Sequence, residues 1–303
     1  MHECRRREAP AKRGPSMNAS VKQFVNLFKL RIGVVIAFTA LAGVAVTPGA
    51  GPSAWQVALL ALAVLVSSAA AGAFNQYYER DLDTRMERTR RRPFVTGSLE
   101  HKPAWLWLIG AMVAGSVLAA ALAVNWESAL YVFLGAFFYA IVYTVLLKRR
   151  TWLNIVIGGL AGSFAVLAGA AAVAPGLSPE AILLAGVLFL WTPSHFWSLA
   201  IANHHDYRAA GVPMLPVVIG DGPCAKVILA NTVLLVALSL APAAFSLGWI
   251  YLAGAVVGGA WFLKKNWELV KAPSRKTALG CFFASLAQLG LLLTAAMVDA
   301  ALR

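Results

Sequence analysis

Residues 32–78 read IGVVIAFTALAGVAVTPGAGPSAWQVALLALAVLVSSAAAGAFNQYY, a run without a single Asp, Glu, Lys or Arg. An apolar helix of about 20 residues crosses the hydrocarbon core of a bilayer, so this run is long enough for two crossings. Residues 47–53, TPGAGPS, supply the turn between them, because clusters of Pro and Gly interrupt helices. We therefore expect two membrane-spanning helices here, near residues 32–47 and 54–78.

The rest of the chain repeats this pattern. Of its 303 residues, 60% are hydrophobic and 13% are charged, which argues against a soluble enzyme or a disordered protein. Pro242 and the turn at residues 246–248 divide the other run that is too long for one crossing. Uncharged runs predict further spans near residues 104–124, 128–147, 152–173, 181–202, 227–245, 248–263 and 277–298. The predicted fold is thus all-α, a polytopic membrane protein with a bundle of nine transmembrane helices over residues 24–303. A polar segment, residues 1–23, precedes this bundle.

The basic residues are distributed very unevenly over the predicted loops. The net charge is +13, yet 25 of the 26 Lys and Arg residues fall on one side of the nine predicted spans. Only Arg303 falls on the other side. Because Lys and Arg are enriched in cytoplasmic loops, we expect the N-terminus inside the cell and the C-terminus outside. This topology accounts for the net positive charge, so the charge does not require a nucleic-acid partner.

The carboxylates on the same side need another explanation, because topology does not require them. Ten of the 13 lie there, and four fall within residues 79–87. If the preceding helix continues, Asn75, Glu79 and Asp83 share one face. Such oxygen ligands suit Mg²⁺, which takes one or two carboxylates plus substrate phosphate oxygens, and the arginines between them suit phosphate. A membrane-edge helix held by salt bridges explains the same pattern without a ligand.

A second unusual segment, residues 191–216, reads WTPSHFWSLAIANHHDYRAAGVPMLP. His195 lies within a predicted span, where an ionisable residue indicates either a function or a histidine hydrogen-bonded inside the bundle. Asp206 follows at the membrane edge, on the same side as the first acidic cluster. His204 and His205 are adjacent, so on a helix they point in different directions and make a poor metal pair. We expect both segments to face one cytoplasmic pocket.

Together these motifs resemble the intramembrane prenyltransferases, and within them the branch that farnesylates heme B. The resemblance covers the chain from about Phe24 onward. The family's motif Asn-x-x-x-Asp-x-x-x-Asp is matched by Asn75, Glu79 and Asp83, and its N-terminal Lys-Pro-Arg by residues 29–31, KLR. Further matches are Asp81, Asp83, Met86, Arg88, Thr89, Arg92 and Pro93, then residues 191–196 (WTPSHF) and 206–217 (DYRAAGVPMLPV).

The resemblance implies transfer of the farnesyl group of farnesyl diphosphate to a vinyl group of heme B, giving heme O for heme-copper oxidase biogenesis. It implies Mg²⁺ as cofactor, the bacterial inner membrane as location, and a heme A synthase or an oxidase assembly factor as candidate partner. The catalytic residues expected are Asn75, Glu79, Asp83 and Asp206, and the metal ligands expected are Glu79, Asp81, Asp83 and Asp206. The substrate-binding residues expected are Lys29, Arg31, Tyr78, Arg85, Arg92, Lys148, Arg149, His195, His204, His205, Tyr207 and Arg208. Among these, Tyr78 or Tyr207 would stabilise a carbocation, and His195 would be an axial ligand of heme.

The chain departs from the family pattern in three places. Glu79 stands where Asp is usual, Leu30 where Pro is usual, and His204 and His205 where the family often carries Lys or Arg. Because histidine loses its charge near neutral pH, we expect activity to fall as pH rises through the histidine range. The alternatives are a prenyltransferase acting on an aromatic acid or quinone precursor, a transporter, and an inactive heme-binding assembly factor.

Overall fold

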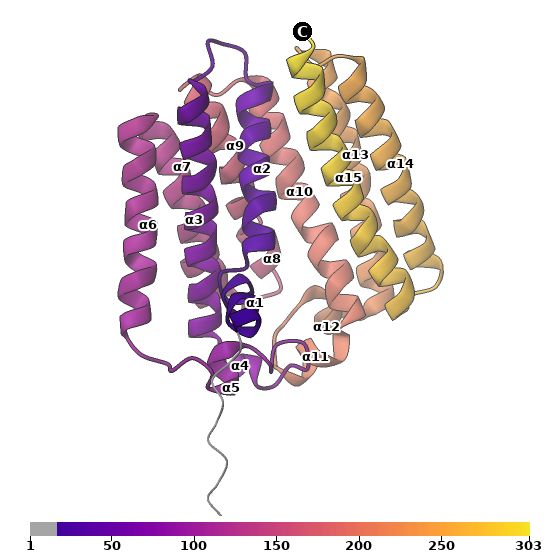
Figure 1. Cartoon of the computed structure of the whole chain (residues 1–303). Helices are drawn as coiled ribbons and strands as arrows, with labels where there is room; N and C mark the ends of the chain where they lie inside the picture. The colour runs from indigo at the N-terminus through magenta and orange to yellow at the C-terminus, as the bar shows by residue number, and fades with distance from the viewer. Residues whose placement is uncertain (1–16) are drawn as a thin grey trace, which may run out of the picture.

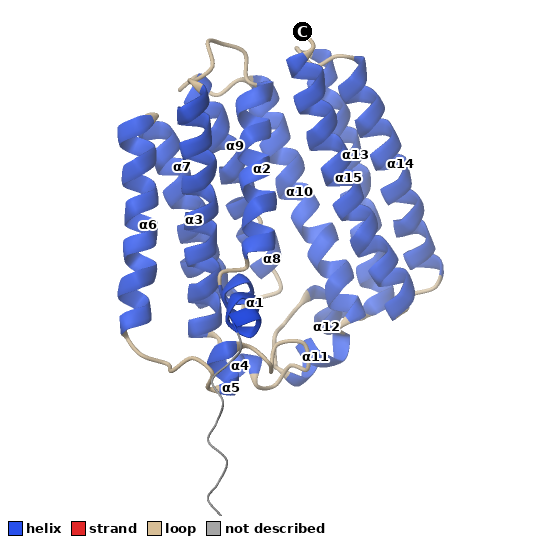
Figure 2. Ribbon diagram, viewed as in Figure 1, coloured by secondary structure: helices blue, strands red, loops and turns tan. Residues whose placement is uncertain are grey.

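The computed structural model describes residues 17–303, and every regular element in this part of the chain is a helix (Figure 1, Figure 2). The bundle is built from α2 (Leu30–Val46), α3 (Ala54–Tyr78), α6 (Ala104–Ala123), α7 (Trp126–Phe137) with the π-helix η1 (Phe138–Leu147), α8 (Asn154–Gly158) with α9 (Leu160–Val173), α10 (Pro179–Ala202), α13 (Asp221–Leu240) with the 3-10 turn η2 (Ala241–Ala244), α14 (Trp249–Lys271) and α15 (Arg275–Ala301). Shorter helices are α1 (Met17–Leu27), α4 (Arg80–Asp83), α5 (Pro93–Thr96), α11 (His204–Ala209) and α12 (Leu215–Ile219). Of the predicted polar segment, residues 1–16 lie outside the described residues.

The long helices confirm a multi-pass membrane architecture. Seven of them are long and apolar enough to cross a bilayer, and the pair α1–α2, bent by 51°, makes an eighth if it counts as one span. These helices lie within a few residues of eight predicted spans, and α3 covers residues 54–78 as predicted. The charged residues that flank the uncharged runs therefore predict where these helices begin and end to within a few residues.

The ninth predicted span, residues 248–263, is the first part of α14. This helix packs against α13 and α15 along the bundle (Figure 1). Its second part carries Lys264, Lys265 and Glu268, and α14 is not among the seven helices that are long and apolar enough to cross a bilayer. A crossing of the membrane by α14 stays a prediction, and so does the total of nine spans.

The helices stand side by side in two groups, with α2, α3, α6, α7 and α9 in one and α10, α13, α14 and α15 in the other (Figure 1). Within the first group, α2 and α9 approach closely at two glycines. A Cβ atom on Gly169 would lie 1.9 Å from the carbonyl oxygen of Ala40, and one on Gly43 would lie 2.1 Å from that of Val166. Only glycine fits at these two positions, as is typical of closely packed membrane helices.

The short helices gather at one end of the bundle. In Figure 1, α1, α4, α5, α11 and α12 lie at the lower end, and the C-terminus lies at the upper end. The two unusual sequence segments, which contain α4 and α11, therefore occupy the same end. We call it the site end.

Candidate active site

The end of α3 places three polar side chains on one buried face. The Glu79 N–H donates to the Asn75 carbonyl (3.0 Å), and the Asp83 N–H donates to the Glu79 carbonyl (2.8 Å), so helical spacing continues from α3 into α4. Asn75, Glu79 and Asp83 are each no more than 2% exposed. The side chain of Asp81, which lies off this face, is 60% exposed. The predicted stripe is therefore present in the structure, and Asp81 is outside it.

Each of the two buried carboxylates is paired with a base. Lys148 Nζ, just after η1, lies 2.5 Å from Glu79 Oε2. Arg92 Nη1, just before α5, donates to both oxygens of Asp83 at 2.8 and 2.7 Å. Burial raises the pKa of Asp83, and the charge of Arg92 opposes that shift. The site thus holds two buried ion pairs side by side along the end of α3.

Lys29 reaches the same group from the bend between α1 and α2. Its backbone lies in the left-handed region (φ 48°, ψ 40°), which is uncommon for a residue other than glycine. Its Nζ donates to Asn75 Oδ1 (2.8 Å) and to the Tyr139 hydroxyl (2.9 Å). Within residues 17–303 it forms no salt bridge. Lys29 is therefore a third basic side chain at this site.

The second sequence segment meets the first directly. Asp206 Oδ2 accepts a hydrogen bond from the Arg88 N–H (3.3 Å). Tyr207 is buried in the same apolar cluster as Leu82 and Met86, and Tyr143 packs against this cluster. The segments around α4 and α11 therefore contact each other at the site end.

Three further predicted residues of this segment, His204, His205 and Arg208, are partly or fully exposed at the site end. His204 Nδ1 is 2.7 Å from Asp221 Oδ1 at the start of α13. His205 and Arg208 are exposed, and neither forms a salt bridge with another described residue. The His204 side chain thus contacts the start of α13.

Three predicted residues, Tyr78, Asp81 and Arg149, form a separate outer group. Arg149 pairs with both oxygens of Asp81 at 2.8 and 2.7 Å, and its guanidinium lies 5.8 Å from the Tyr78 ring centre. The hydrogen bonds from Arg149 lower the pKa of Asp81. Arg85 is also exposed and forms no salt bridge with another described residue. These residues lie near the buried pairs in sequence but face solvent.

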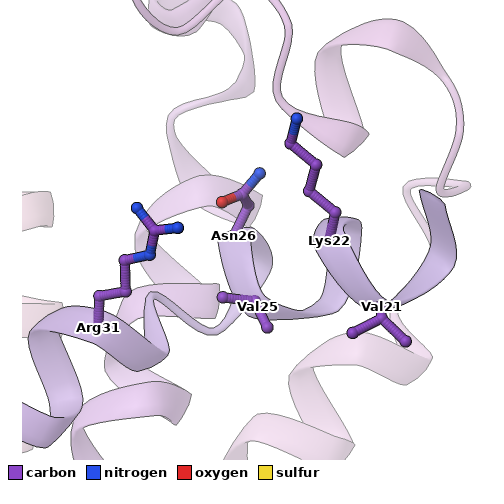
Figure 3. A pocket seen from close by; sticks show the side chains of 5 residues that line it. All are labelled: Val21, Lys22, Val25, Asn26 and Arg31. Carbon is purple, nitrogen blue, oxygen red and sulfur yellow. The ribbon is translucent and has the colours of Figure 1, made fainter. Parts of the chain in front are cut away.

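Arg31 does not join Lys29, although the two are only two residues apart. It lines a surface pocket between α1 and α2, where its guanidinium and the polar ends of Lys22 and Asn26 point to the same side (Figure 3). Val21 and Val25 complete the lining. The predicted basic pair is therefore divided between the buried site and this pocket.

The π-helix η1 brings residues that sequence reasoning missed. Thr144 Oγ1 accepts a hydrogen bond from Asn75 Nδ2 (3.2 Å), and the rings of Tyr139 and Tyr143 stack with centres 5.5 Å apart. Lys148 Nζ lies 5.6 Å from the Tyr143 ring centre. π-Helices often occur at functional sites. The only signal in the sequence was three hydroxyl side chains in an uncharged run that ends at Lys148.

His195 lies in α10, buried among aromatic rings. Its ring stacks between Trp191 and Phe282, with centres 4.2 and 4.4 Å away, and Nδ1 lies 2.7 Å from Ser285 Oγ. Nε2 makes no hydrogen bond to another described residue. One ring nitrogen therefore has the bundle partner that a structural histidine needs, and the predicted role of His195 as a heme ligand stays a prediction.

The carboxylate oxygens at the end of α3 fit a divalent cation that binds together with a phosphate group. Glu79 Oε1 is buried without a hydrogen-bond partner among residues 17–303, an arrangement that is costly for a carboxylate oxygen. Among residues 17–303, no three His, Cys, Asp or Glu side chains are grouped as a ready-made metal site. Mg²⁺ does not need one, because it commonly takes one or two carboxylates and completes its shell with water and substrate phosphates.

Comparison with known proteins agrees with this fold. Residues 36–289 match the UbiA prenyltransferase family. A curated relative from Paramagnetospirillum magneticum, named protoheme IX farnesyltransferase 2, is 59% identical over 283 residues, covering 93% of this chain and 98% of the relative. Two solved structures share the fold at low sequence identity. A digeranylgeranylglyceryl phosphate synthase has a TM-score of 0.76 at 17% identity, covering 92% of this chain and 98% of its own. A UbiA homologue from Archaeoglobus fulgidus, bound to DMAPP and Mg²⁺, has a TM-score of 0.67 at 18% identity, covering 91% and 99%.

The chain therefore belongs to the UbiA prenyltransferase family of membrane enzymes. Within that family it groups with the protoheme IX farnesyltransferases, because its identity to one of them extends over nearly the whole length of both chains. The sequence-based expectation of a prenyltransferase is confirmed.

Proposed function

We propose that the protein transfers the farnesyl group of farnesyl diphosphate to a vinyl group of heme B and so makes heme O. The observation that carries this proposal is the 59% identity to a protein named protoheme IX farnesyltransferase, which is spread over the whole domain. The buried acids and bases at the end of α3 support the diphosphate part of the reaction. The heme part rests on the relative's name and on the match of residues 191–196.

The reaction begins when the bond between C1 of the farnesyl chain and the diphosphate oxygen breaks, and the electron pair leaves with the diphosphate. Lys29, Lys148 and Arg92 supply positive charge where the leaving group would lie. Glu79 and Asp83, with Asp206 from the second segment, would hold Mg²⁺. When bound, Mg²⁺ would neutralise charge that develops on the diphosphate oxygens.

The farnesyl cation needs an electron-rich, dry surface next to the phosphates. Tyr139 and Tyr143 present stacked rings directly beside Lys29 and Lys148, so they suit this role better than the exposed Tyr78. The vinyl group of heme then attacks C1 to form the new carbon–carbon bond. Water adds to the cation left on the former vinyl group, and loss of a proton gives the hydroxyethylfarnesyl side chain.

The location follows from the same proposal. The site end would face the cytoplasm, as the distribution of Lys and Arg predicts, and the protein would reside in the bacterial inner membrane. The farnesyl tail and the heme would lie between helices, within the apolar part of the bundle. Heme O would then pass to a heme A synthase or an oxidase assembly factor.

The proposal is tested with the purified protein, Mg²⁺, farnesyl diphosphate and heme B. Asp83→Asn keeps the size of the side chain but removes a proposed metal ligand, so product formation should fall about 100-fold or more. Heme binding, followed by absorbance, should persist. Glu87→Gln is the matched control, because Glu87 is an exposed carboxylate whose one salt bridge to a described residue is with Arg90. Full activity in Asp83→Asn would count against the proposed site.

A further inference from the structure

The proposed metal ligands already have partners in the substrate-free protein. The side chains of Glu79 and Asp83 are 0% and 2% exposed, and their partners Lys148 and Arg92 are 11% and 18% exposed. These are buried ion pairs, held in a medium where charges interact strongly. A metal can bind both carboxylates fully only if the two bases move.

The site holds one base more than its two ion pairs use. Glu79 and Asp83 are each paired with one base, and Lys29 is a third base whose hydrogen-bond partners, Asn75 and Tyr139, are both neutral. Asp206, the remaining proposed ligand, accepts a hydrogen bond from the Arg88 N–H. A bare divalent cation would add two positive charges beside Lys148 and Arg92. A diphosphate that binds with the metal supplies negative charge and offers oxygens to both displaced bases.

We infer that Lys148 and Arg92 are internal counter-ions, which hold Glu79 and Asp83 in the free enzyme and transfer to the diphosphate when metal and diphosphate bind together. This inference rests on the proposed function, since it takes Glu79 and Asp83 as metal ligands. Of the four carboxylate oxygens in the two pairs, Glu79 Oε1 is the one without a hydrogen-bond partner among the described residues, so a cation can bind it without displacing a donor. Displacement then continues at Glu79 Oε2 and at Asp83.

The consequence is strong coupling between the two ligands. By linkage, the factor by which metal tightens diphosphate binding equals the factor by which diphosphate tightens metal binding, and we expect about tenfold or more. Bare metal binds weakly because the chain's own bases compete for the carboxylates. The free enzyme therefore does not fill its site with metal alone.

The test measures two ligands separately on the full-length protein. Binding of Mn²⁺ alone is followed by electron paramagnetic resonance, and binding of labelled pyrophosphate by equilibrium dialysis with and without Mn²⁺. In the wild type, Mn²⁺ should raise pyrophosphate affinity about tenfold or more. In Lys148→Gln, which keeps a donor but removes the charge, affinity for Mn²⁺ alone should rise about tenfold, and pyrophosphate affinity should fall.

Two further variants separate this mechanism from general damage. Lys148→Arg keeps the charge and should restore weak binding of bare Mn²⁺. Lys265→Met removes a Lys–Glu pair on α14 (Lys265 Nζ to Glu268 Oε2, 2.7 Å) and should bind Mn²⁺ as the wild type does. If Lys148→Gln does not fold, as judged by its melting temperature, Arg92→Gln provides the same test at Asp83.

Unchanged or weaker binding of bare Mn²⁺ in the folded Lys148→Gln protein would overturn the inference. So would a wild-type pyrophosphate affinity that does not respond to Mn²⁺. Neither result would count against heme farnesylation itself, because no farnesyl group or heme is present in the assay. A wild-type protein that binds neither ligand, singly or together, would overturn both the inference and the proposed function.

Discussion

At the residue scale, Glu79 has contacts that suit two roles. It pairs with Lys148 in the ligand-free protein, and it is a proposed Mg²⁺ ligand when substrate is bound. It is fully buried, its Oε2 pairs with Lys148, and its Oε1 has no hydrogen-bond partner in the part of the chain that the structure describes. The family pattern has Asp at this position, and Glu adds one methylene of reach. Its carboxylate lies against Lys148, the residue that directly follows η1. The buried oxygen without a donor among the described residues is the local observation that supports the proposed metal ligand.

His195 is the residue whose role in heme binding can be tested most directly. His195→Ala removes the free Nε2, so affinity for heme B should fall about tenfold, with a shift of the main heme absorbance band. Ser285→Ala removes only the hydrogen bond to Nδ1 and should have a smaller effect. Absorbance titration measures both variants. Unchanged heme affinity and turnover in His195→Ala would remove this residue from the site.

At the scale of elements, glycines decide how closely helices approach. Gly169 and Gly162 lie on the same helix, α9, but only Gly169 faces a neighbouring backbone, while Gly162 has open space around it. Gly169→Ala forces α2 and α9 apart and should cost about 1–3 kcal/mol of stability. Gly162→Ala should leave stability unchanged or slightly raised. Thermal unfolding in detergent measures the pair, and equal loss in both would refute close packing as the role of Gly169.

The spans could be predicted because charged residues mark their ends, so that α3 was predicted residue for residue. The stripe of Asn75, Glu79 and Asp83 could also be predicted, since the helical spacing alone places them on one face. The π-helix η1 could not be predicted, because an uncharged apolar run looks the same in α- and π-helices. Its tyrosines were therefore missed.

The partner of each carboxylate could not be predicted either. The segment after α3 contains several arginines, and only tertiary packing selects Arg92 for Asp83 while Arg85 stays exposed. The same holds for Lys29 and Arg31, which are close in sequence but face different sites because the chain bends between α1 and α2. The spacing of residues in the sequence predicts which acidic and basic residues lie at the site end. Tertiary packing then determines which of them form ion pairs.

At the scale of the molecule, both chemically unusual segments lie at one end of the bundle and the C-terminus at the other (Figure 1). Single cysteines in a cysteine-free background test which end faces the cytoplasm. Ser98→Cys, in the exposed loop after α5, should react with a membrane-impermeant maleimide only in inverted vesicles. Gly51→Cys, in the exposed loop between α2 and α3, should react in intact cells. The reverse pattern would place the site end outside and contradict the predicted orientation.

Heme farnesylation is the central claim, and the mass of the product tests it most directly. The purified protein is given heme B, Mg²⁺ and isotope-labelled farnesyl diphosphate, with an aromatic acid present as a competing acceptor. We predict a labelled porphyrin whose mass equals heme B plus one farnesyl group and one hydroxyl, and no labelled aromatic product. Unmodified heme B together with a farnesylated aromatic acid would contradict the account.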